Sequence, residues 1–384
     1  MKESLYGELS VIGMKGCEQF AAQVDAYLRE WRNHGRSDDA SFLVDVNCPR
    51  FGSGEAKGVI TKSLRGHDVY IICDPFNYGV TYKMYGQTVP MSPDDHFCDI
   101  KRILGAIAGK ARRASLIMPM LYEGRQHKRS GRESLDCATA LQDLEAMGVT
   151  NILTFDAHDP RVQNAIPLCG FENIHPTYQM IKALVKQVPD ISLDKEDLLI
   201  ISPDEGAMGR CMYYSSVLGL DIGMFYKRRN YSIVVDGRNP IEAHEYLGND
   251  VAGKDVIIID DMIASGESII DVAMKIKEKG AKRIFVFETF GLFTAGLDKF
   301  DKAYEDGLFN KIFTTNLVYR TPELLARPWY AEVNMCKYVS YIIDTLNHDE
   351  SISGLLAPYN RINALLERHK KERATQLSMQ FDNK

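Results

Sequence analysis

The chain has 384 residues, of which 45% are hydrophobic, so it can bury a large core, and its length favours two domains over one. Its formal net charge of −6 argues against nonspecific binding to nucleic acid or to an anionic membrane. A small charged substrate held in a local basic pocket remains compatible with this charge.

The 8 cysteines are scattered along the chain without a C-x-x-C pair, so the sequence predicts neither a zinc site nor a disulfide framework. No basic segment followed by an apolar stretch opens the sequence, and no apolar run approaches the roughly 18 residues of a membrane span. We therefore expect a soluble, cytoplasmic protein with reduced thiols.

The first half of the chain alternates apolar runs with amphipathic stretches. Strands are predicted at 42–46, 69–73, 115–121 and 151–155, and helices at 18–31, 94–113 and 136–147. Such alternation indicates an α/β domain with a mainly parallel sheet, expected over residues 1–185.

Three polar loops follow predicted strands of this half. They are a turn-rich loop at 47–55, a segment at 122–134 with four Arg or Lys in about eight positions, and a loop in which acids flank His158. Ligands of open α/β sheets bind at the carboxyl ends of strands, which favours a binding role. A solvated charged face and a structural histidine are the more common interpretations of such patterns, and both stay open at this point.

The stretch Lys186 to Asp197 is the best candidate linker, and a second domain is expected over 186–345. Its predicted strands are 198–202, 222–226, 283–290 and 312–315. Directly after the strand predicted at 222–226, the basic triplet Lys227-Arg228-Arg229 leads into a polar segment long enough to be a mobile loop. The remaining residues, 346–384, are predicted to form a charged helical tail.

The stretch from Lys254 to Ala273 carries the most specific pattern. The apolar run Val256 to Ile259 predicts a buried strand, two acids follow at Asp260 and Asp261, and a small polar loop at 264–268 leads into a predicted helix. Backbone N–H groups and the helix dipole converge on such a loop and suit a phosphate monoester. The paired carboxylates suit sugar hydroxyls or a metal ion. An ordinary strand-to-helix turn with a serine N-cap is the alternative.

This stretch resembles the ribose-phosphate binding motif of the type I phosphoribosyltransferase fold. The resemblance implies that Asp260 and Asp261 face the ribose hydroxyls. It also implies that the 5-phosphate is held by Ala264, Ser265, Gly266, Glu267 and Ser268. Glu267 stands where the motif usually has a small residue, and an acid beside a phosphate costs affinity unless it points away.

Five further segments resemble, in the right order, the ribose-phosphate pyrophosphokinase family over roughly residues 40 to 350. They are Phe51-Gly52-Ser53-Gly54-Glu55, Arg125-Gln126, Asp156-Ala157-His158, Ser202-Pro203-Asp204 with Gly206, and Lys227-Arg228-Arg229. The resemblance implies two phosphoribosyltransferase-like α/β domains. It assigns ATP binding to Phe51, Ser53, Glu55, Arg125 and Gln126, Mg²⁺ binding to His158 and Asp204, and catalysis on a flexible loop to Lys227 and Arg229. His127, Asp159 and Ala264 depart from the family pattern.

The reaction implied is attack of the C1 hydroxyl of ribose 5-phosphate on the β-phosphorus of ATP, which gives phosphoribosyl pyrophosphate and AMP for nucleotide biosynthesis. Positive charge aimed at the transferring group is what this chemistry asks of the protein. The expected partners are ATP, ribose 5-phosphate, Mg²⁺ and further copies of the chain in a dimer-based homo-oligomer, with no nucleic acid and no membrane. A non-catalytic regulatory paralogue and a phosphoribosyltransferase are the alternatives.

Overall fold

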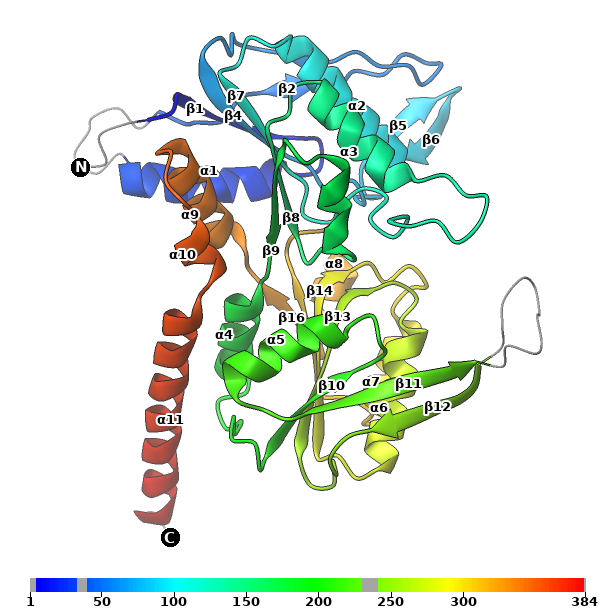
Figure 1. The fold of residues 1–384 in the computed structure, drawn as a ribbon, viewed down its shortest axis with the longest axis vertical. Coiled ribbons are helices and arrows are strands. Elements are labelled where there is room, and N and C mark those ends of the chain that lie inside the picture. The colour runs from blue at the N-terminus through cyan, green and yellow to red at the C-terminus, as the bar shows by residue number, and fades with distance from the viewer. Residues whose placement is uncertain (1–4, 33–39, 230–240, 383–384) are drawn as a thin grey trace. The chain divides into compact units, whose positions relative to one another are not determined.

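The computed structural model describes residues 5–32, 40–229 and 241–382, drawn as coloured ribbon in Figure 1. The chain divides into two compact units. Unit 1 holds residues 1–176, 316–319 and 334–357, and unit 2 holds 177–315, 320–333 and 358–384. The chain therefore first passes between units at 176/177, against the boundary expected at 185/186, and later returns to unit 1.

Unit 1 is built on a parallel sheet of 5 strands in the order β1-β4-β7-β8-β9. These strands are β1 (Glu8–Gly13), β4 (His67–Ile72), β7 (Arg113–Ile117), β8 (Asn151–Phe155) and β9 (Gly170–Ile174). The helices are α1 (Glu18–Arg32), α2 (Pro93–Ile107), α3 (Asp136–Ala146), α9 (Cys336–Asn347) and α10 (Ser353–Leu356), with the 3-10 helix η1 (Pro160–Ala165). Two small hairpins, β2 (Val46–Asn47) with β3 (Val59–Ile60) and β5 (Thr81–Met84) with β6 (Gln87–Pro90), complete it.

Three features of unit 1 differ in detail from the prediction. Strand β1 was missed, because its short apolar run lies in a segment that otherwise reads as mixed and charged. The helix expected to reach residue 113 ends at Ile107, since Ala108 and Gly109 adopt left-handed backbone conformations with φ of 53° and 66°. Residues 42–46 form mainly an extended segment that bridges to β1 rather than a full strand.

Unit 2 contains a sheet of 7 strands in the order β12-β11-β10-β13-β14-β15-β16, in which only β12 is antiparallel to its neighbour. The strands are β10 (Leu198–Ser202), β11 (Ile222–Arg229), β12 (Ile241–Leu247), β13 (Asp255–Ile263), β14 (Arg283–Gly291), β15 (Lys311–Thr315) and β16 (Tyr330–Val333). The helices are α4 (Thr177–Gln187), α5 (Met208–Leu218), α6 (Glu267–Glu278), α7 (Asp298–Glu305), α8 (Pro322–Leu325) and α11 (Tyr359–Asp382). The mainly parallel α/β architecture predicted for both halves is confirmed.

The central strands of unit 2 are buried on both faces, as their continuous apolar runs predict. On one face Ile258 and Val286 pack with Ile269 and Val272 of α6 and with Phe300 of α7. This packing fixes the junction between β13 and α6, the segment on which the sequence-based prediction of a sugar-phosphate site rests.

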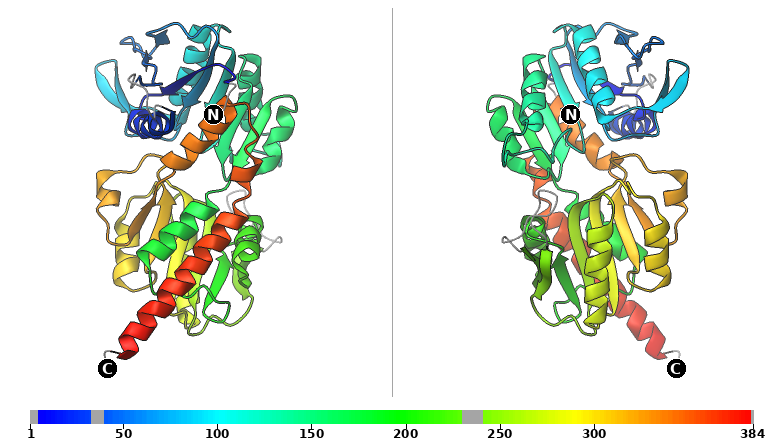
Figure 2. Two further views of the ribbon diagram at one scale, coloured as in Figure 1. Left: turned by 90° about the vertical axis from the view of Figure 1, so that its left-hand side faces the viewer. Right: turned by 90° about the vertical axis from the view of Figure 1, so that its right-hand side faces the viewer.

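Helix α11 forms the part of the predicted charged tail from Tyr359 to Asp382 and packs beside α4, as the left view of Figure 2 shows. Its apolar contact residues Ile362 and Leu365 are buried, and the ring of His369 hydrogen-bonds the carbonyl of Ile191 at 2.9 Å. The tail therefore packs on unit 2.

The basic triplet does not lie on a loop, because Lys227, Arg228 and Arg229 continue strand β11 and pair in antiparallel register with β12. Residues 230–240 lie outside the described part of the chain, as do the side chains of Lys227 and Arg229. The predicted position of the triplet is corrected to the end of a β-hairpin strand, where pairing with β12 satisfies its backbone.

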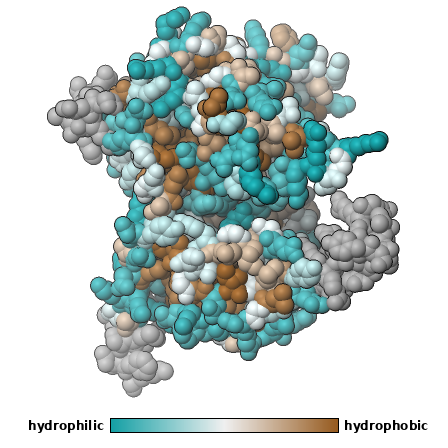
Figure 3. Space-filling view, in the orientation of Figure 1, coloured by the Kyte–Doolittle hydropathy of each residue, from teal (hydrophilic) through white to brown (hydrophobic). Residues whose placement is uncertain are grey.

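The surface shown in Figure 3 is mostly hydrophilic, with apolar side chains in small patches. Among the described residues, no helix combines the length and the apolar character needed to cross a membrane.

Candidate substrate sites of the two units

The two acids of the predicted sugar site lie inside strand β13, which continues two residues beyond them. Asp261 is buried, and its backbone N–H donates to Oδ1 of Asp260 at 2.8 Å. The Asp260 side chain keeps 24% of its surface exposed and lies 3.4 Å from Nη1 of Arg210 on α5. The exposed carboxylate is therefore Asp260, and one arginine faces it.

Burial raises the pKa of the Asp260 carboxyl to about 7, and the neighbouring charge of Asp261 adds to the shift, while Arg210 opposes it. A carboxyl with such a pKa is poised to exchange its proton for a hydrogen-bond donor or a cation near neutral pH. These properties suit a group that binds hydroxyls or a metal-bound substrate.

The loop after β13 is shorter than expected, because α6 begins at Glu267 and only residues 264–266 separate strand and helix. Gly266 has φ of +81°, and a Cβ atom built on it would lie 2.0 Å from Cζ of Phe300. A glycine is therefore required where the chain turns into α6. The unpaired N–H groups of the first turn of a helix form a ready-made anion site at this point.

Glu267, the departure from the expected motif, forms an ion pair with Lys299 of α7, with Oε1 and Nζ 2.8 Å apart. Lys299 lowers the pKa of Glu267. Its carboxylate is thus engaged on the α7 side, and the cost of an acid beside a bound phosphate is reduced.

Asp204, predicted to bind metal, shapes the turn between β10 and α5. Its Oδ1 accepts N–H groups from Gly206 at 2.9 Å and Ala207 at 3.3 Å, and its carbonyl accepts the Ser202 hydroxyl at 2.7 Å. The charge of Asp204 also contributes to the raised pKa of Asp260. Asp204 and Asp260 therefore belong to one electrostatic group at the carboxyl ends of β10 and β13.

Glu288 of β14 belongs to the same group and was missed by the sequence-based interpretation. It is 0% exposed, and neither carboxyl oxygen has a hydrogen-bond partner among the described residues. An unsatisfied buried polar group destabilises the folded state by about 1–3 kcal/mol. A buried acid in an apolar strand is therefore unfavourable for stability alone and is a candidate for a functional role. The signal that could have found it is a single acid in the run Ile284 to Phe290.

In unit 1 the predicted ATP-base loop is the tip of a tight turn. The N–H of Phe51 donates to the carbonyl of Glu55 at 2.7 Å, and the Ser53 hydroxyl donates to its carboxylate at 2.8 Å. The preceding Arg50 is fixed by Asp99 at 2.9 Å and lies 4.9 Å from the ring centroid of Tyr82. The Phe51 ring is 56% exposed and so offers a face on which a base can stack.

Arg125 and Gln126, the predicted contacts to the phosphates of ATP, differ in whether their side chains are free to bind a ligand. Arg125 is exposed in the loop after β7. The side-chain amide of Gln126 instead donates to the carbonyl of Ser134 at 2.9 Å, a bond that links the two ends of the segment 126–134. Arg125 is therefore the better placed of the two for a phosphate.

Two residues that depart from the family pattern lie close together: His127 in the loop after β7 and Asp159 in the loop after β8. Nε2 of His127 lies 3.5 Å from Oδ2 of Asp159, and the ring centroids of His127 and His158 are 5.4 Å apart. Hydrogen bonds from Arg161 lower the pKa of Asp159 to about 2. His158 itself is exposed, and the nearby Asp156 hydrogen-bonds His175 from a left-handed backbone with φ of 37°.

The described residues contain no cluster of three or more His, Cys, Asp or Glu side chains that could hold a metal ion by themselves. The two predicted ligands, His158 and Asp204, belong to different units. The donor chemistry of Asp204 nevertheless fits Mg²⁺, which protein sites commonly hold through one or two carboxylates together with substrate phosphates.

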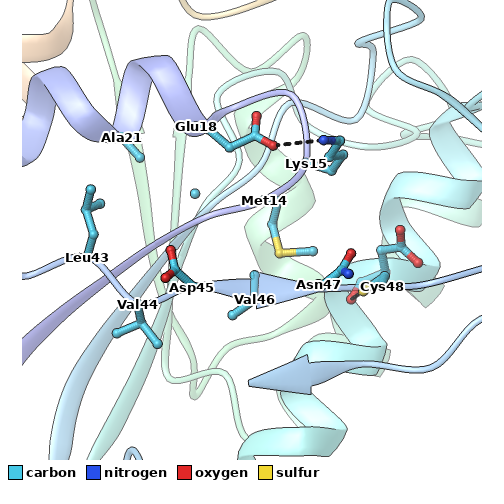
Figure 4. Close-up of a pocket in the computed structure, with 12 residues that line it drawn as sticks. Met14, Lys15, Glu18, Ala21, Leu43, Val44, Asp45, Val46, Asn47 and Cys48 are labelled. Atoms are coloured by element: carbon cyan, nitrogen blue, oxygen red, sulfur yellow. Dashed lines mark hydrogen bonds and ion pairs between the residues drawn. The ribbon is translucent and has the colours of Figure 1, made fainter. Parts of the chain in front are cut away.

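One further pocket lies in unit 1 at the carboxyl end of β1 (Figure 4). It is lined by the end of β1, the start of α1 and the segment 43–48, and Lys15 and Glu18 pair at its rim at 3.5 Å. None of the predicted site residues lines it.

A parallel α/β unit with an acid pair in one strand and an anion loop before the following helix is a phosphoribosyltransferase-like unit. Residues 9–148 match the N-terminal domain of ribose phosphate pyrophosphokinase, and residues 233–357 match the phosphoribosyl synthetase-associated domain. The chain belongs to the ribose-phosphate pyrophosphokinase family.

Individual relatives bear this out. The ribose-phosphate pyrophosphokinase of Ureaplasma parvum is 30% identical over 284 residues, covering 73% of this chain and 78% of the relative. That of Vibrio cholerae is 26% identical over 320 residues, covering 82% and 91%. The crystal structure of phosphoribosylpyrophosphate synthetase from Mycobacterium smegmatis superimposes with a TM-score of 0.71 at 18% identity, covering 89% of this chain and 99% of that one, and supports the fold.

Proposed function

We propose that this chain transfers the pyrophosphoryl group of ATP to the C1 hydroxyl of ribose 5-phosphate and releases phosphoribosyl pyrophosphate and AMP. Family membership supports the reaction. The proposed ribose 5-phosphate site rests on one observation. The acid pair Asp260-Asp261 in β13 is followed closely by Gly266, where the chain turns into the N-terminus of α6.

In this proposal Asp260 and Asp261 hold the vicinal hydroxyls of the ribose. The backbone of Ala264 to Ser268 holds the 5-phosphate, with the hydroxyls of Ser265 and Ser268 as added donors. Glu267 does not contact the phosphate, because Lys299 holds its carboxylate.

Unit 1 binds ATP in the same proposal. The exposed Phe51 ring stacks on the base, with Ser53 and Glu55 shaping the turn beneath it. Arg125 contacts the phosphates, and Gln126 keeps its loop closed around that arginine. His158 and Asp204 are the proposed Mg²⁺ ligands, and Mg²⁺ when bound neutralises charge on the phosphate oxygens.

Lys227 and Arg229 are proposed to supply positive charge to the transferring group. Phosphoryl transfer requires positioning and charge neutralisation more than covalent chemistry, and two basic residues at the end of β11 fit that requirement. We further propose that the protein works in the cytoplasm and assembles as a dimer-based homo-oligomer, both on family resemblance.

The test is AMP release by the purified chain with ATP, Mg²⁺ and ribose 5-phosphate. AMP should appear in step with phosphoribosyl pyrophosphate, and omission of ribose 5-phosphate should abolish it. No AMP at any magnesium or phosphate concentration contradicts the proposal and favours a regulatory paralogue. Base-dependent release of pyrophosphate from phosphoribosyl pyrophosphate instead identifies a phosphoribosyltransferase.

A further inference from the structure

Glu288 lies in the middle of the buried strand β14, beside the proposed sugar site. It is 0% exposed, and both of its carboxyl oxygens lack a hydrogen-bond partner among the described residues. In the sheet register it stands next to Asp260 of β13 on one side and Thr314 of β15 on the other.

The charged groups around Glu288 are mostly acids. Asp260 and Asp261 from β13, Asp204 from the turn after β10 and Arg210 from α5 act on it. Burial and the charge of Asp260 raise the pKa of Glu288 well above its ordinary value. Burial among these acids favours the neutral carboxyl group, which carries an O–H donor.

Of the two register neighbours of Glu288 in its row across the sheet, Asp260 is the charged acceptor. Thr314 hydrogen-bonds the Tyr330 hydroxyl at 2.9 Å, and Glu332, next in the row, pairs with Arg320 at 2.9 Å. Asp260 is the remaining member of the row, on a strand about 4.8 Å away, which is within reach of a side-chain hydrogen bond.

We infer that Glu288 is a positioning residue for ribose 5-phosphate: as a neutral acid it donates a hydrogen bond to the Asp260 carboxylate in the sugar complex. This inference rests on the proposed function above. The bond fixes one Asp260 oxygen and leaves its other lone pairs to the ribose hydroxyls. A neutral donor does so without adding negative charge beside an anionic sugar phosphate.

The experiment compares three variants. Glu288→Leu removes the donor at similar volume, Glu288→Gln keeps a neutral donor, and Thr314→Val removes a buried hydroxyl from the same row on the other side. AMP formation is measured against ribose 5-phosphate at saturating ATP, and against ATP at saturating ribose 5-phosphate. Glu288→Met repeats the test if the leucine variant does not fold.

Glu288→Leu should raise KM for ribose 5-phosphate about tenfold, the effect of losing one hydrogen bond to a charged group, with KM for ATP unchanged. Glu288→Gln should stay within about threefold of the parent, and Thr314→Val should leave both KM values unchanged. An unchanged sugar KM in a folded Glu288→Leu, or a Gln variant as impaired as the Leu variant, overturns the inference.

Failure of the proposed function gives a different result. If the parent chain releases no AMP, calorimetric titration with ribose 5-phosphate still compares the parent with Glu288→Leu, and weaker binding by the variant supports the positioning role. Equal binding, or no binding by either protein, overturns it.

Discussion

Glu267 at the start of α6 and Lys299 of α7 form an ion pair of 2.8 Å, although both side chains are largely exposed. Lys299 thereby offsets the charge of the acid that lies at the proposed 5-phosphate site. Lys299 lowers the pKa of Glu267, so the acid is charged but compensated.

Replacing Lys299 by Ala should therefore leave an uncompensated carboxylate beside the bound 5-phosphate. KM for ribose 5-phosphate should rise about two- to threefold at low salt and return toward the parent value at high salt, because exposed charges are screened. The double variant Glu267→Ala with Lys299→Ala should restore the parent KM. A salt-independent effect would contradict the electrostatic explanation.

Gly266→Ala should both destabilise unit 2 and weaken ribose 5-phosphate binding. The backbone at φ of +81° disfavours alanine by about 1–2 kcal/mol, and the clash with Phe300 adds to this. The control is Gly280→Ala, which has φ of +90° but a nearest neighbour at 3.5 Å. Thermal unfolding should show a smaller loss for the control, and equal losses would mean that the Phe300 contact is unimportant.

Asp260→Asn should stabilise the protein at pH 8 and have little effect at pH 4. The pKa of Asp260 is raised from 3.8 to about 7 in the folded chain, so the folded state favours the protonated form. This contribution is fully present below pH 4 and is lost as pH rises through 7, a difference on the order of 2–4 kcal/mol. Thermal unfolding across that range checks it.

Glu305→Gln gives the matched control, since it removes one carboxyl charge from an exposed position of α7. Lower stability of Asp260→Asn at pH 8 would mean that the ionised carboxylate is favoured in the folded chain. The same variant should lose ribose 5-phosphate activity at every pH.

Arg113→Met should destabilise unit 1 by about 3–5 kcal/mol, because it leaves a buried carboxylate unpaired. Asp68 is 0% exposed and accepts Arg113 at 2.7 and 2.6 Å, while Asn347 of α9 donates to it at 2.8 Å. Urea unfolding measures the loss. Arg368→Met, in an ion pair whose side chains are each 63% exposed, is the control and should change stability by less than about 1 kcal/mol.

Lys227→Ala should lower turnover about 10²- to 10³-fold while ATP binding stays near the parent level, because the proposed role of Lys227 is in the transition state. Single-turnover AMP formation and nucleotide titration separate the two effects. Arg228→Ala, between the two proposed catalytic residues, is the comparison, and an unchanged rate for Lys227→Ala removes that residue from the mechanism.

The sequence by itself determined the α/β class, the order of the motifs and the position of the acid pair and glycine turn. These features follow from local rules: a run such as Val256 to Ile259 is apolar because its strand is buried on both faces, and Gly266 is glycine because its turn requires a positive φ. A local pattern of this kind is visible without the fold.

Tertiary structure alone decided which residues meet. Three features join residues that lie well apart in sequence: the return of α9 to unit 1, the ion pair of Glu267 with Lys299 and the position of Glu288 beside Asp260. The pairing of Lys227 to Arg229 with β12 is closer in sequence but equally invisible in the local pattern. Glu288 in particular reads as an ordinary polar interruption of a strand. It becomes a candidate site residue only because the sheet register sets it next to Asp260 and burial removes water from both of its oxygens.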